Sequence, residues 1–354
     1  MLKSLTIENF RCFQNFELQQ LGQINLLVGK NNSGKTSILE AIQLLKSRSN
    51  LEPLRQIMLN RGEYILNERR NNRRELDIRH LFHGHQIHKN SYFSISANSQ
   101  DQQEAIHFLV ESSPQLNLFE EFQDLILSID WLGSQHHFEI PLTSTSLPLK
   151  HFREIDPNLQ QLNTIIQWLT SSTLTTEKMV EFFNDIVLTP EETIITAALQ
   201  IVEPNIDRIA SLVSANPDQS GLTTRFVAKL KDSDERIPIG SMGDGIWRML
   251  GLTLAMVNAR NGVLLVDEID TGLHYSTMSD MWRLMSETAK RLNVQVFATT
   301  HNNDCWRSLA TIADHEKSTE SNIIIHRIEK EKNHSVVFTE KQIIIATEHD
   351  IEVR

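Results

Sequence analysis

A glycine-rich stretch early in the chain has the residue types that bind phosphate. Residues 29–36 read GKNNSGKT and are followed by Ser37. Backbone N–H groups of such a loop can wrap a triphosphate, because glycine lacks the Cβ that would block a tight turn. A lysine then supplies charge to the terminal phosphates, and a threonine hydroxyl suits Mg²⁺. The pattern predicts a nucleotide-binding loop made of Gly29, Asn31, Asn32, Ser33, Gly34, Lys35, Thr36 and Ser37.

Two adjacent carboxylates late in the chain could complete this chemistry. The apolar run VLLV at 263–266 is followed by Asp267 and Glu268. A carboxylate at the end of a strand can hold Mg²⁺, and the next one can polarise an attacking water. Acidic strand ends are also common without function. Together with the loop, however, they predict Mg²⁺ binding by Thr36 and Asp267, and catalysis by Glu268 with Lys35.

A second candidate phosphate contact is SMGDG at 241–245. Its two glycines precede an amphipathic pattern over 244–259, and Asp244 is available as the N-cap of that helix. A helix N-terminus carries about half a positive charge and can bind an anion. Taken alone, the stretch is better explained by ordinary helix capping, but its position about twenty residues before VLLVDE favours a phosphate contact.

Strands and helices must place these residues at their ends. We expect strands over 2–10 and before Gly29, a helix from Ser33 onward, and a polar loop over 48–75. The C-terminal half alternates between helix and strand over 244–300, which is typical of a parallel α/β sheet. Further strands are expected at 76–82, 91–97 and 125–131, and helical periodicity is expected over 151–220.

The order and wording of these motifs resemble the ABC/SMC-type ATPases of the RecF and OLD kind. They are most similar to the stand-alone AAA family ATPases of bacterial defence-type operons. The similarity covers about the first 95 residues and residues 235–354. The matching pieces are LTIENFRCF, VGKNNSGKTSILEAI, DIRHLF, SMGDG-x-WRML, LLVDEIDTGLHYS, ATTH and EHDIEVR.

The resemblance implies an α/β fold, an ABC-type ATPase head of the P-loop NTPase class with a mixed sheet. Residues 1–100 would form the N-terminal part of the head, with the Walker A loop, and 101–150 a β-rich continuation. Residues 151–220 would be a helical insertion. Residues 221–354 would form the C-terminal part, with the signature, the Walker B strand and the switch histidine.

The resemblance also implies that two heads dimerise head-to-tail around two ATP molecules. Ser241 and Gly243 would then contact the γ-phosphate held by the partner, although Met242 and Asp244 depart from the usual LSGGQ wording. Asp270 would lie in the segment that links the two sites. The other implied roles are γ-phosphate sensing by His301, contact with the γ-phosphate or attacking water by Asn32, and proximity to the nucleotide for Asn9 and Arg11.

Composition limits the possible partners. The 354 residues carry a net charge of −11 and only two cysteines, which suggests a reducing, cytoplasmic setting and argues against a surface that coats nucleic acid everywhere. No apolar run reaches the ~18 residues of a membrane span. Residues 46–79 hold nine Lys/Arg against five Asp/Glu, including RRNNRR at 69–74. This segment is either a solvated loop or a patch that contacts nucleic acid, such as DNA, or a partner protein.

Four histidines at spacings of three, two and three, namely His80, His83, His85 and His88, could suit a metal ion. If the segment is a strand, however, His83 and His85 face one side and the other two face the opposite side. A surface or turn cluster is therefore the alternative.

Three roles follow for the whole chain. The first is an Mg²⁺-dependent ATPase, a homodimer or higher even oligomer, that regulates a separately encoded effector such as a nuclease in phage defence. A separate effector is expected because no second catalytic constellation is visible in the sequence. The second is a RecF-like DNA-binding repair or recombination ATPase, and the third uses the nucleotide only as structural glue.

Overall fold

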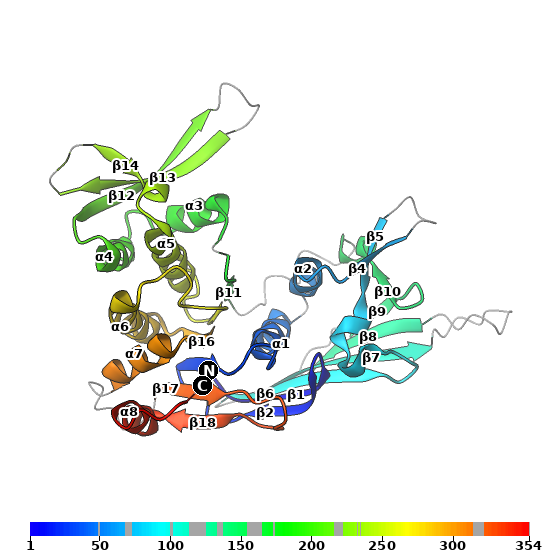
Figure 1. The fold of residues 1–354 in the computed structure, drawn as a ribbon. Coiled ribbons are helices and arrows are strands. Elements are labelled where there is room, and N and C mark those ends of the chain that lie inside the picture. Colours follow the sequence, from blue (N-terminus) through cyan, green and yellow to red (C-terminus); the bar gives the residue numbers. More distant parts are fainter. Residues whose placement is uncertain are drawn as a thin grey trace. The chain divides into compact units, whose positions relative to one another are not determined.

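A computed structural model describes most of the chain and divides it into two compact units. Each unit is discontinuous in sequence, since unit 1 holds residues 1–21, 30–164 and 328–337, and unit 2 holds 22–29, 165–327 and 338–354 (Figure 1). The described residues are 1–48, 50–67, 73–99, 102–112, 125–132, 137–153, 165–172, 174–215, 222–231, 233, 235–313 and 322–353.

Unit 1 is built on an antiparallel sheet with the strand order β2-β1-β6-β7-β8-β9. Its strands are β1 (Leu2–Phe10), β2 (Phe13–Leu18), β6 (Tyr92–Ser99), β7 (Gln103–Ser112), β8 (Leu125–Trp131) and β9 (His137–Pro141). Along β7, buried side chains alternate with partly exposed ones, as expected for a sheet with one covered face. The rings of Phe93 and Phe108 stack in this core, with centroids 4.2 Å apart.

Two helices and a small second sheet complete unit 1. Helix α1 (Lys35–Ser47) contacts β6 and β7, and α2 (Glu52–Asn60) contacts α1. The small sheet has the order β10-β5-β4. Its strands, with the short 3-10 segments of this unit, are β4 (Tyr64–Asn67), β5 (Arg73–Asp77), β10 (Ser146–Pro148), η2 (Ile78–Leu81), η3 (His83–His85) and η4 (Leu149–Arg153).

Unit 2 contains a sheet with the order β11-β15-β16-β3-β17-β18, of which the first five strands are parallel. They are β11 (Ile166–Leu169), β15 (Val263–Val266), β16 (Gln295–Thr299), β3 (Ile24–Val28), β17 (Ile323–Arg327) and β18 (Val336–Thr339). Every residue of β3 is buried, which fits a central parallel strand. Its polar Asn25 is satisfied, because its amide donates to the carbonyls of Gly22 (2.9 Å) and Val296 (3.2 Å).

Helices cover this sheet, and a second small sheet follows α4. The helices are α3 (Thr176–Asn184), α4 (Glu192–Val202), α5 (Asp244–Val257), α6 (Tyr275–Leu292), α7 (Asn303–Ala313) and α8 (Glu340–Glu348). The small sheet, with its following 3-10 turn, consists of β12 (Ile206–Ala215), β13 (Leu222–Leu230), β14 (Arg236–Pro238) and η6 (Ile239–Ser241). Trp282 and Trp306 are fully buried in the core of the unit.

The mixed α/β architecture and the alternation over 244–300 are confirmed. The polar loop expected over 48–75 is wrong, because α2 and β4 lie there. Leu54, Ile57 and Met58 give α2 a buried face, and a proline occupies its first turn. The region 151–220 is less helical than its pattern indicates. It contains α3 and α4, but β11 joins the core sheet and β12 opens the small one.

Candidate functional site

The predicted phosphate loop connects the end of β3 to the start of α1. The Lys35 ammonium donates a hydrogen bond to the carbonyl of Lys30 at 2.9 Å, so the lysine folds back along its own loop. Asn31 and Asn32 are exposed, and Asn32 has a left-handed backbone with φ 61°. The loop therefore offers polar groups and backbone to solvent while its lysine is buried.

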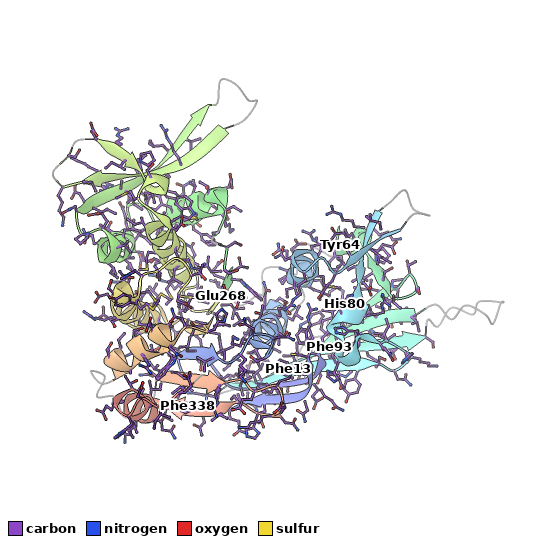
Figure 2. All side chains as sticks on the ribbon, in the orientation of Figure 1. Phe13, Tyr64, His80, Phe93, Glu268 and Phe338 are labelled. Atoms are coloured by element: carbon purple, nitrogen blue, oxygen red, sulfur yellow. The ribbon has the colours of Figure 1, made fainter. Side chains whose placement is uncertain are left out.

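Gly34 is required by packing as well as by backbone conformation. Its φ is +99°, and a Cβ there would lie 2.3 Å from Cζ of Phe13 and 2.7 Å from Sγ of Cys12. Both neighbours belong to the β1–β2 turn, and Phe13 is labelled in Figure 2. Desolvation raises the pKa of the Cys12 thiol. The glycine we assigned to phosphate approach thus also seats the loop on the turn before it.

The first turn of α1 has no side-chain cap and no acidic residue. Gly34 is the N-cap, and the amide of Ile38 bonds to its carbonyl at 3.0 Å. The earlier N–H groups of an α-helix have no partner within the helix, so they can serve an anion. This geometry suits the phosphate group that the sequence predicts.

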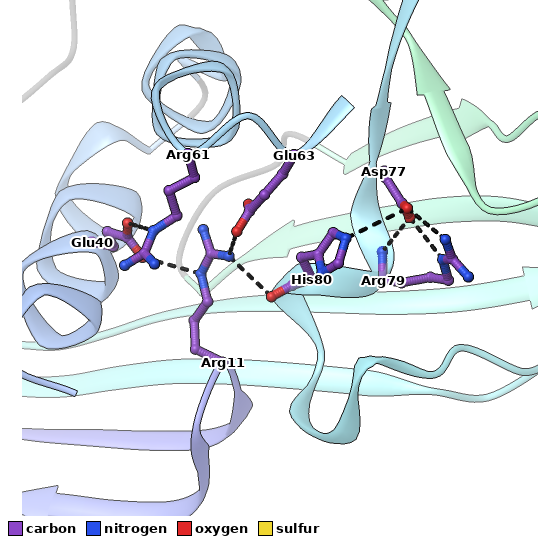
Figure 3. Close-up of polar contacts among 7 residues, drawn as sticks. All are labelled: Arg11, Glu40, Arg61, Glu63, Asp77, Arg79 and His80. Carbon is purple, nitrogen blue, oxygen red and sulfur yellow. Dashed lines mark hydrogen bonds and ion pairs between the residues drawn. The ribbon is translucent and has the colours of Figure 1, made fainter. Parts of the chain in front are cut away.

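Arg11 lies in a buried ionic network of unit 1, which we call the Arg11 clamp: Arg11, Glu40, Arg61 and Glu63 (Figure 3). Its Nε donates to Glu40 at 3.0 Å, and its Nη1 contacts Glu63 and the His80 carbonyl. Arg61 donates to the second oxygen of Glu40 at 2.5 Å. Burial raises the pKa of Glu40, against the attraction of both arginines.

The contacts of the Arg11 clamp engage the guanidinium that the resemblance places near the nucleotide. Its Nε and Nη1 make three contacts, with Glu40, Glu63 and the His80 carbonyl. Nη2 has no hydrogen-bond partner among the described residues. Both Asn9 (φ 52°) and Arg11 (φ 57°) have left-handed backbones at the end of β1. Proximity of these two residues to a nucleotide stays a prediction.

In unit 2 the two carboxylates after β15 meet residues from the end of β16. The Thr299 hydroxyl donates to Asp267 Oδ1 at 2.6 Å and accepts from the Glu268 amide at 2.8 Å. His301 Nε2 lies 3.2 Å from Glu268 Oε1, and both side chains are about two-fifths exposed. The structure therefore brings together the predicted catalytic glutamate and the predicted switch histidine (Glu268 in Figure 2).

Asp270 is held by a neighbour of this cluster. The Thr300 hydroxyl donates to Asp270 Oδ1 at 2.7 Å, so the segment after Glu268 is tied to the same strand end. Thr299 and Thr300 were not singled out from the sequence, although both lie in the ATTH motif. Their roles depend on parallel pairing of β15 with β16, which aligns the carboxyl ends of the strands.

The signature residues are exposed on unit 2. Ser241, Gly243 and Asp244 lie at the junction of η6 and α5, and the backbone of Gly243 has φ +99°. The N-cap expected of Asp244 is wrong, because Gly243 is the N-cap and no side chain caps the helix. A Cβ on Gly245 would lie 3.2 Å from the Gly272 carbonyl, so the signature packs on the segment after Asp270.

Arg248 is a residue that the sequence did not single out. It lies on α5 and is 2% exposed. Its guanidinium donates to three main-chain carbonyls, those of Thr170 (2.7 Å), Glu268 (2.7 Å) and Asp267 (3.1 Å). The WRML wording that follows the signature was the available signal, but backbone acceptors leave no trace in a sequence.

The basic stretch 46–79 is largely neutralised where it is described. Lys46, Arg55, Arg61 and Arg79 pair with Glu104, Glu52, Glu40 and Asp77 respectively. Residues 69–72 of RRNNRR lie outside the described residues. Arg74 stacks over the ring of Tyr64, 4.9 Å from its centroid.

The strand assumed for the histidine cluster is wrong, since η2 and η3 form there instead. Gly84 (φ 79°) and His85 (φ 58°) turn the chain, so that the His80 and His85 rings come within 5.3 Å. His83 contacts the Arg11 carbonyl at 3.2 Å. Among the described residues, no group of three His, Cys, Asp or Glu side chains is arranged to hold a metal. None of the described helices is long and apolar enough to cross a membrane.

The chain is similar to known proteins in sequence and in fold. The AAA ATPase domain family model matches residues 1–146 and 111–305. An "ATP/GTP phosphatase" of Helicobacter pylori is 22% identical over 332 residues, which is 86% of each chain. A "DNA replication and repair protein RecF" of Clostridioides difficile is 52% identical over 44 residues, 12% of each chain.

Among solved structures, an SMC head bound to the C-winged helix domain of ScpA superposes with a TM-score of 0.53. It shares 13% identity and covers 96% of this chain and 97% of that chain. This likeness shows the fold, and the family match shows the activity, which sets aside nucleotide as mere structural glue. The chain belongs to the AAA ATPase domain family, hydrolyses ATP, and has the fold of an SMC head.

Proposed function

We propose that the chain is an Mg²⁺-dependent ATPase whose hydrolysis follows ATP-driven, head-to-tail dimerisation, and that dimer closure regulates a separately encoded effector. The observation that carries this proposal is the surface of unit 2 around α5. There Ser241 and Gly243 are exposed, the start of α5 has no side-chain cap, and Gly245 of the same stretch packs on Gly272 in the segment that follows Glu268 and Asp270.

The chain supplies oxygen ligands of the kind that Mg²⁺ takes, a hydroxyl on Thr36 and a carboxylate on Asp267. We expect these two residues to hold the ion. Thr299 already orients one oxygen of Asp267 by a 2.6 Å hydrogen bond. When bound, Mg²⁺ would neutralise charge on the phosphates. Residues of the loop Gly29–Ser37 would bind the phosphates through N–H groups, with Lys35 as the cation.

Glu268 is the general base of the proposed reaction. Its carboxylate is partly exposed and is contacted by His301, so it can accept a proton from water while the histidine senses the terminal phosphate. One head leaves the far side of that phosphate in water. A second head would cover it with the N-terminus of α5 and lower the local dielectric, which strengthens every charge in the site. Such a dimer interface is isologous.

The test is Glu268→Gln. We expect ATP binding to persist, a dimer to accumulate with Mg·ATP, and turnover to fall about 10²–10⁴-fold, since general-base catalysis contributes that much. Light scattering coupled to gel filtration measures the dimer, and phosphate release measures turnover. Wild-type turnover in the mutant would remove Glu268 from the mechanism, and a monomer at saturating Mg·ATP would refute closure.

The effector is proposed to be a protein such as a nuclease that acts in phage defence. Two observations support a protein partner over nucleic acid, namely the net charge of −11 and the pairing of the described basic residues in 46–79. A head of this fold has been crystallised with a winged helix domain of another protein. Affinity purification of the Glu268→Gln protein with Mg·ATP tests the idea. Recovery of the same partner without ATP would show that partner binding does not depend on dimer closure.

A RecF-like DNA-binding repair ATPase is the second candidate. The short, high-identity match to RecF proteins favours it. Phosphate contacts release counterions, so DNA binding by such a protein should weaken steeply with salt. Gel shifts at two salt concentrations decide between the roles. Tight and strongly salt-dependent binding favours repair, and no shift favours the effector.

A further inference from the structure

Arg248 is buried in a way that differs from an ordinary ion pair. A buried guanidinium is usually matched by a carboxylate, because an unpaired charge is costly to desolvate. The Arg248 guanidinium donates to three backbone carbonyls, and burial lowers its pKa in spite of the negative charge on Asp270, Glu268 and Asp267. The Arg248 side chain therefore holds main-chain segments in place.

Two of those carbonyls belong to Asp267 and Glu268, at the point where the chain leaves β15. Glu268 has φ 50°, which is uncommon for a residue other than glycine and is retained only where the surroundings impose it. Arg248 holds its carbonyl at 2.7 Å, and the Thr299 hydroxyl holds its amide at 2.8 Å. The backbone of Glu268 is pinned from both sides, which sets where its carboxylate points.

Helix α5 joins Arg248 to the signature residues Ser241 and Gly243. Its N-cap is Gly243, and Arg248 lies five residues further along the same helix. Gly245 also meets the carbonyl of Gly272 within the segment that follows Glu268. A shift of the helix at its exposed end must therefore move the guanidinium that holds the Glu268 carbonyl.

We propose that Arg248 is a positioning residue, which sets the backbone of Glu268 and links engagement of Ser241 and Gly243 to the aim of the catalytic carboxylate. The proposal rests on the proposed function, because it assumes that Glu268 is the base and that α5 meets a second head. It goes further in naming the physical link between the two.

The first test compares Arg248→Lys and Arg248→Met with the wild type. We expect the turnover number to fall about 10–100-fold, the usual effect of losing a group that orients a reacting residue. The KM for ATP, the affinity for a fluorescent ATP analogue and ATP-driven dimerisation should stay within about twofold. The control is Thr253→Val, which should leave turnover unchanged, because Thr253 is buried on the same helix and, among the described residues, its hydroxyl donates to the Met249 carbonyl alone.

A double-mutant cycle separates positioning from general support of the fold. In the Glu268→Gln background, Arg248→Lys should lower the residual turnover by less than about twofold, because both changes act through one carboxylate. A full additional loss overturns the proposal. So does parallel loss of binding, dimerisation and thermal stability in both Arg248 variants, since that assigns Arg248 to folding. If the wild-type protein stays monomeric with ATP, the proposed dimer closure is refuted. Non-additive effects of the Arg248 and Glu268 substitutions on turnover would still support the positioning of Glu268 by Arg248.

Discussion

Each unit contains an almost completely buried arginine, and the two are satisfied in opposite ways. Arg11 in unit 1 meets the carboxylates of Glu40 and Glu63, whereas Arg248 in unit 2 meets main-chain carbonyls. The first arrangement ties side chains of a turn, a helix and a helix end to one another. The second fixes the path of the backbone at a strand end.

The difference indicates which group is held in place in each unit. In unit 1 the Arg11 clamp anchors the turn that carries Cys12 and Phe13, on which Gly34 is seated. In unit 2 the residue that needs control is Glu268 itself, whose backbone has an unusual conformation. A charged acceptor suits the first task, because side chains can be brought together from distant segments. Carbonyl acceptors suit the second, because they belong to the residue being positioned.

Of the substitutions that test this comparison, Glu40→Gln should lower the free energy of unfolding most. It removes the carboxylate that Arg11 and Arg61 share and leaves Glu63 as the only carboxylate of the Arg11 clamp, and breaking a buried ion pair costs roughly 3–5 kcal/mol. Urea unfolding of the full chain measures the loss. The control is Glu52→Gln, whose partner Arg55 is one-third exposed and whose loss should cost below about 1 kcal/mol. Equal losses of unfolding free energy in the two variants would show that the Arg11 clamp stabilises the protein no more than a partly exposed ion pair does.

Gly34→Ala tests whether the phosphate loop rests on the turn that the clamp holds. We expect a loss of about 3 kcal/mol and at least tenfold weaker ATP-analogue binding, from the left-handed backbone plus the clash with Phe13. Gly62→Ala is the matched control, since φ is +70° there and nothing lies within 4 Å of the added Cβ. It should cost only about 1–2 kcal/mol. Identical costs would leave the packing argument without support.

Acid should weaken unit 2 through His326, which is fully buried in β17. Burial lowers the pKa of His326 to about 3, whereas the unfolded chain takes up the proton near pH 6.5. Stability is therefore full above pH 6.5 and falls as the pH drops toward 3, by about 2 kcal/mol between pH 6.5 and 5. The unfolding free energy of His326→Leu should lack this part of the slope. An unchanged slope contradicts the assignment.

The smallest effect belongs to an exposed pair in unit 1. Hydrogen bonds to Asp130 and Glu139 raise the pKa of His137. The stabilisation is present below pH 6.5 and disappears as the pH rises through the raised value. His137 is about half exposed, so the effect should stay below about 1 kcal/mol. Unfolding of His137→Gln at pH 6 and pH 9 measures it, and a large difference at pH 9 would be inconsistent with this origin.

The sequence was most informative where local pattern and chemistry coincide. Residues 29–36 and 263–268 lie where their spacing placed them, between a buried strand and a helix and at the end of β15. The pairing of Glu268 with His301 follows from two parallel strands that end together. The signature helix begins at Asp244 as expected, but without the expected cap.

Contacts between distant segments could not be foreseen. Arg11 meets Glu40 and Glu63 across 29 and 52 residues, and nothing in the spacing of these side chains indicates a network. Arg248 was invisible because its acceptors are carbonyls, which every residue has. Helix α2 was missed for another reason, since its apolar positions were outweighed by the charged residues around them.

The position of β3 in its sheet has a consequence for how the protein is made. This strand lies between β16 and β17, and the contact from Asn25 to Val296 spans 271 residues. Closing so long a loop is slow, because chain entropy is lost before the pairing compensates for it. During synthesis the apolar segment that leads into the phosphate loop stays uncovered until β16, about 270 residues later in the chain, has emerged from the ribosome. We therefore expect nascent chains truncated before β16 to need chaperone protection that the complete chain does not.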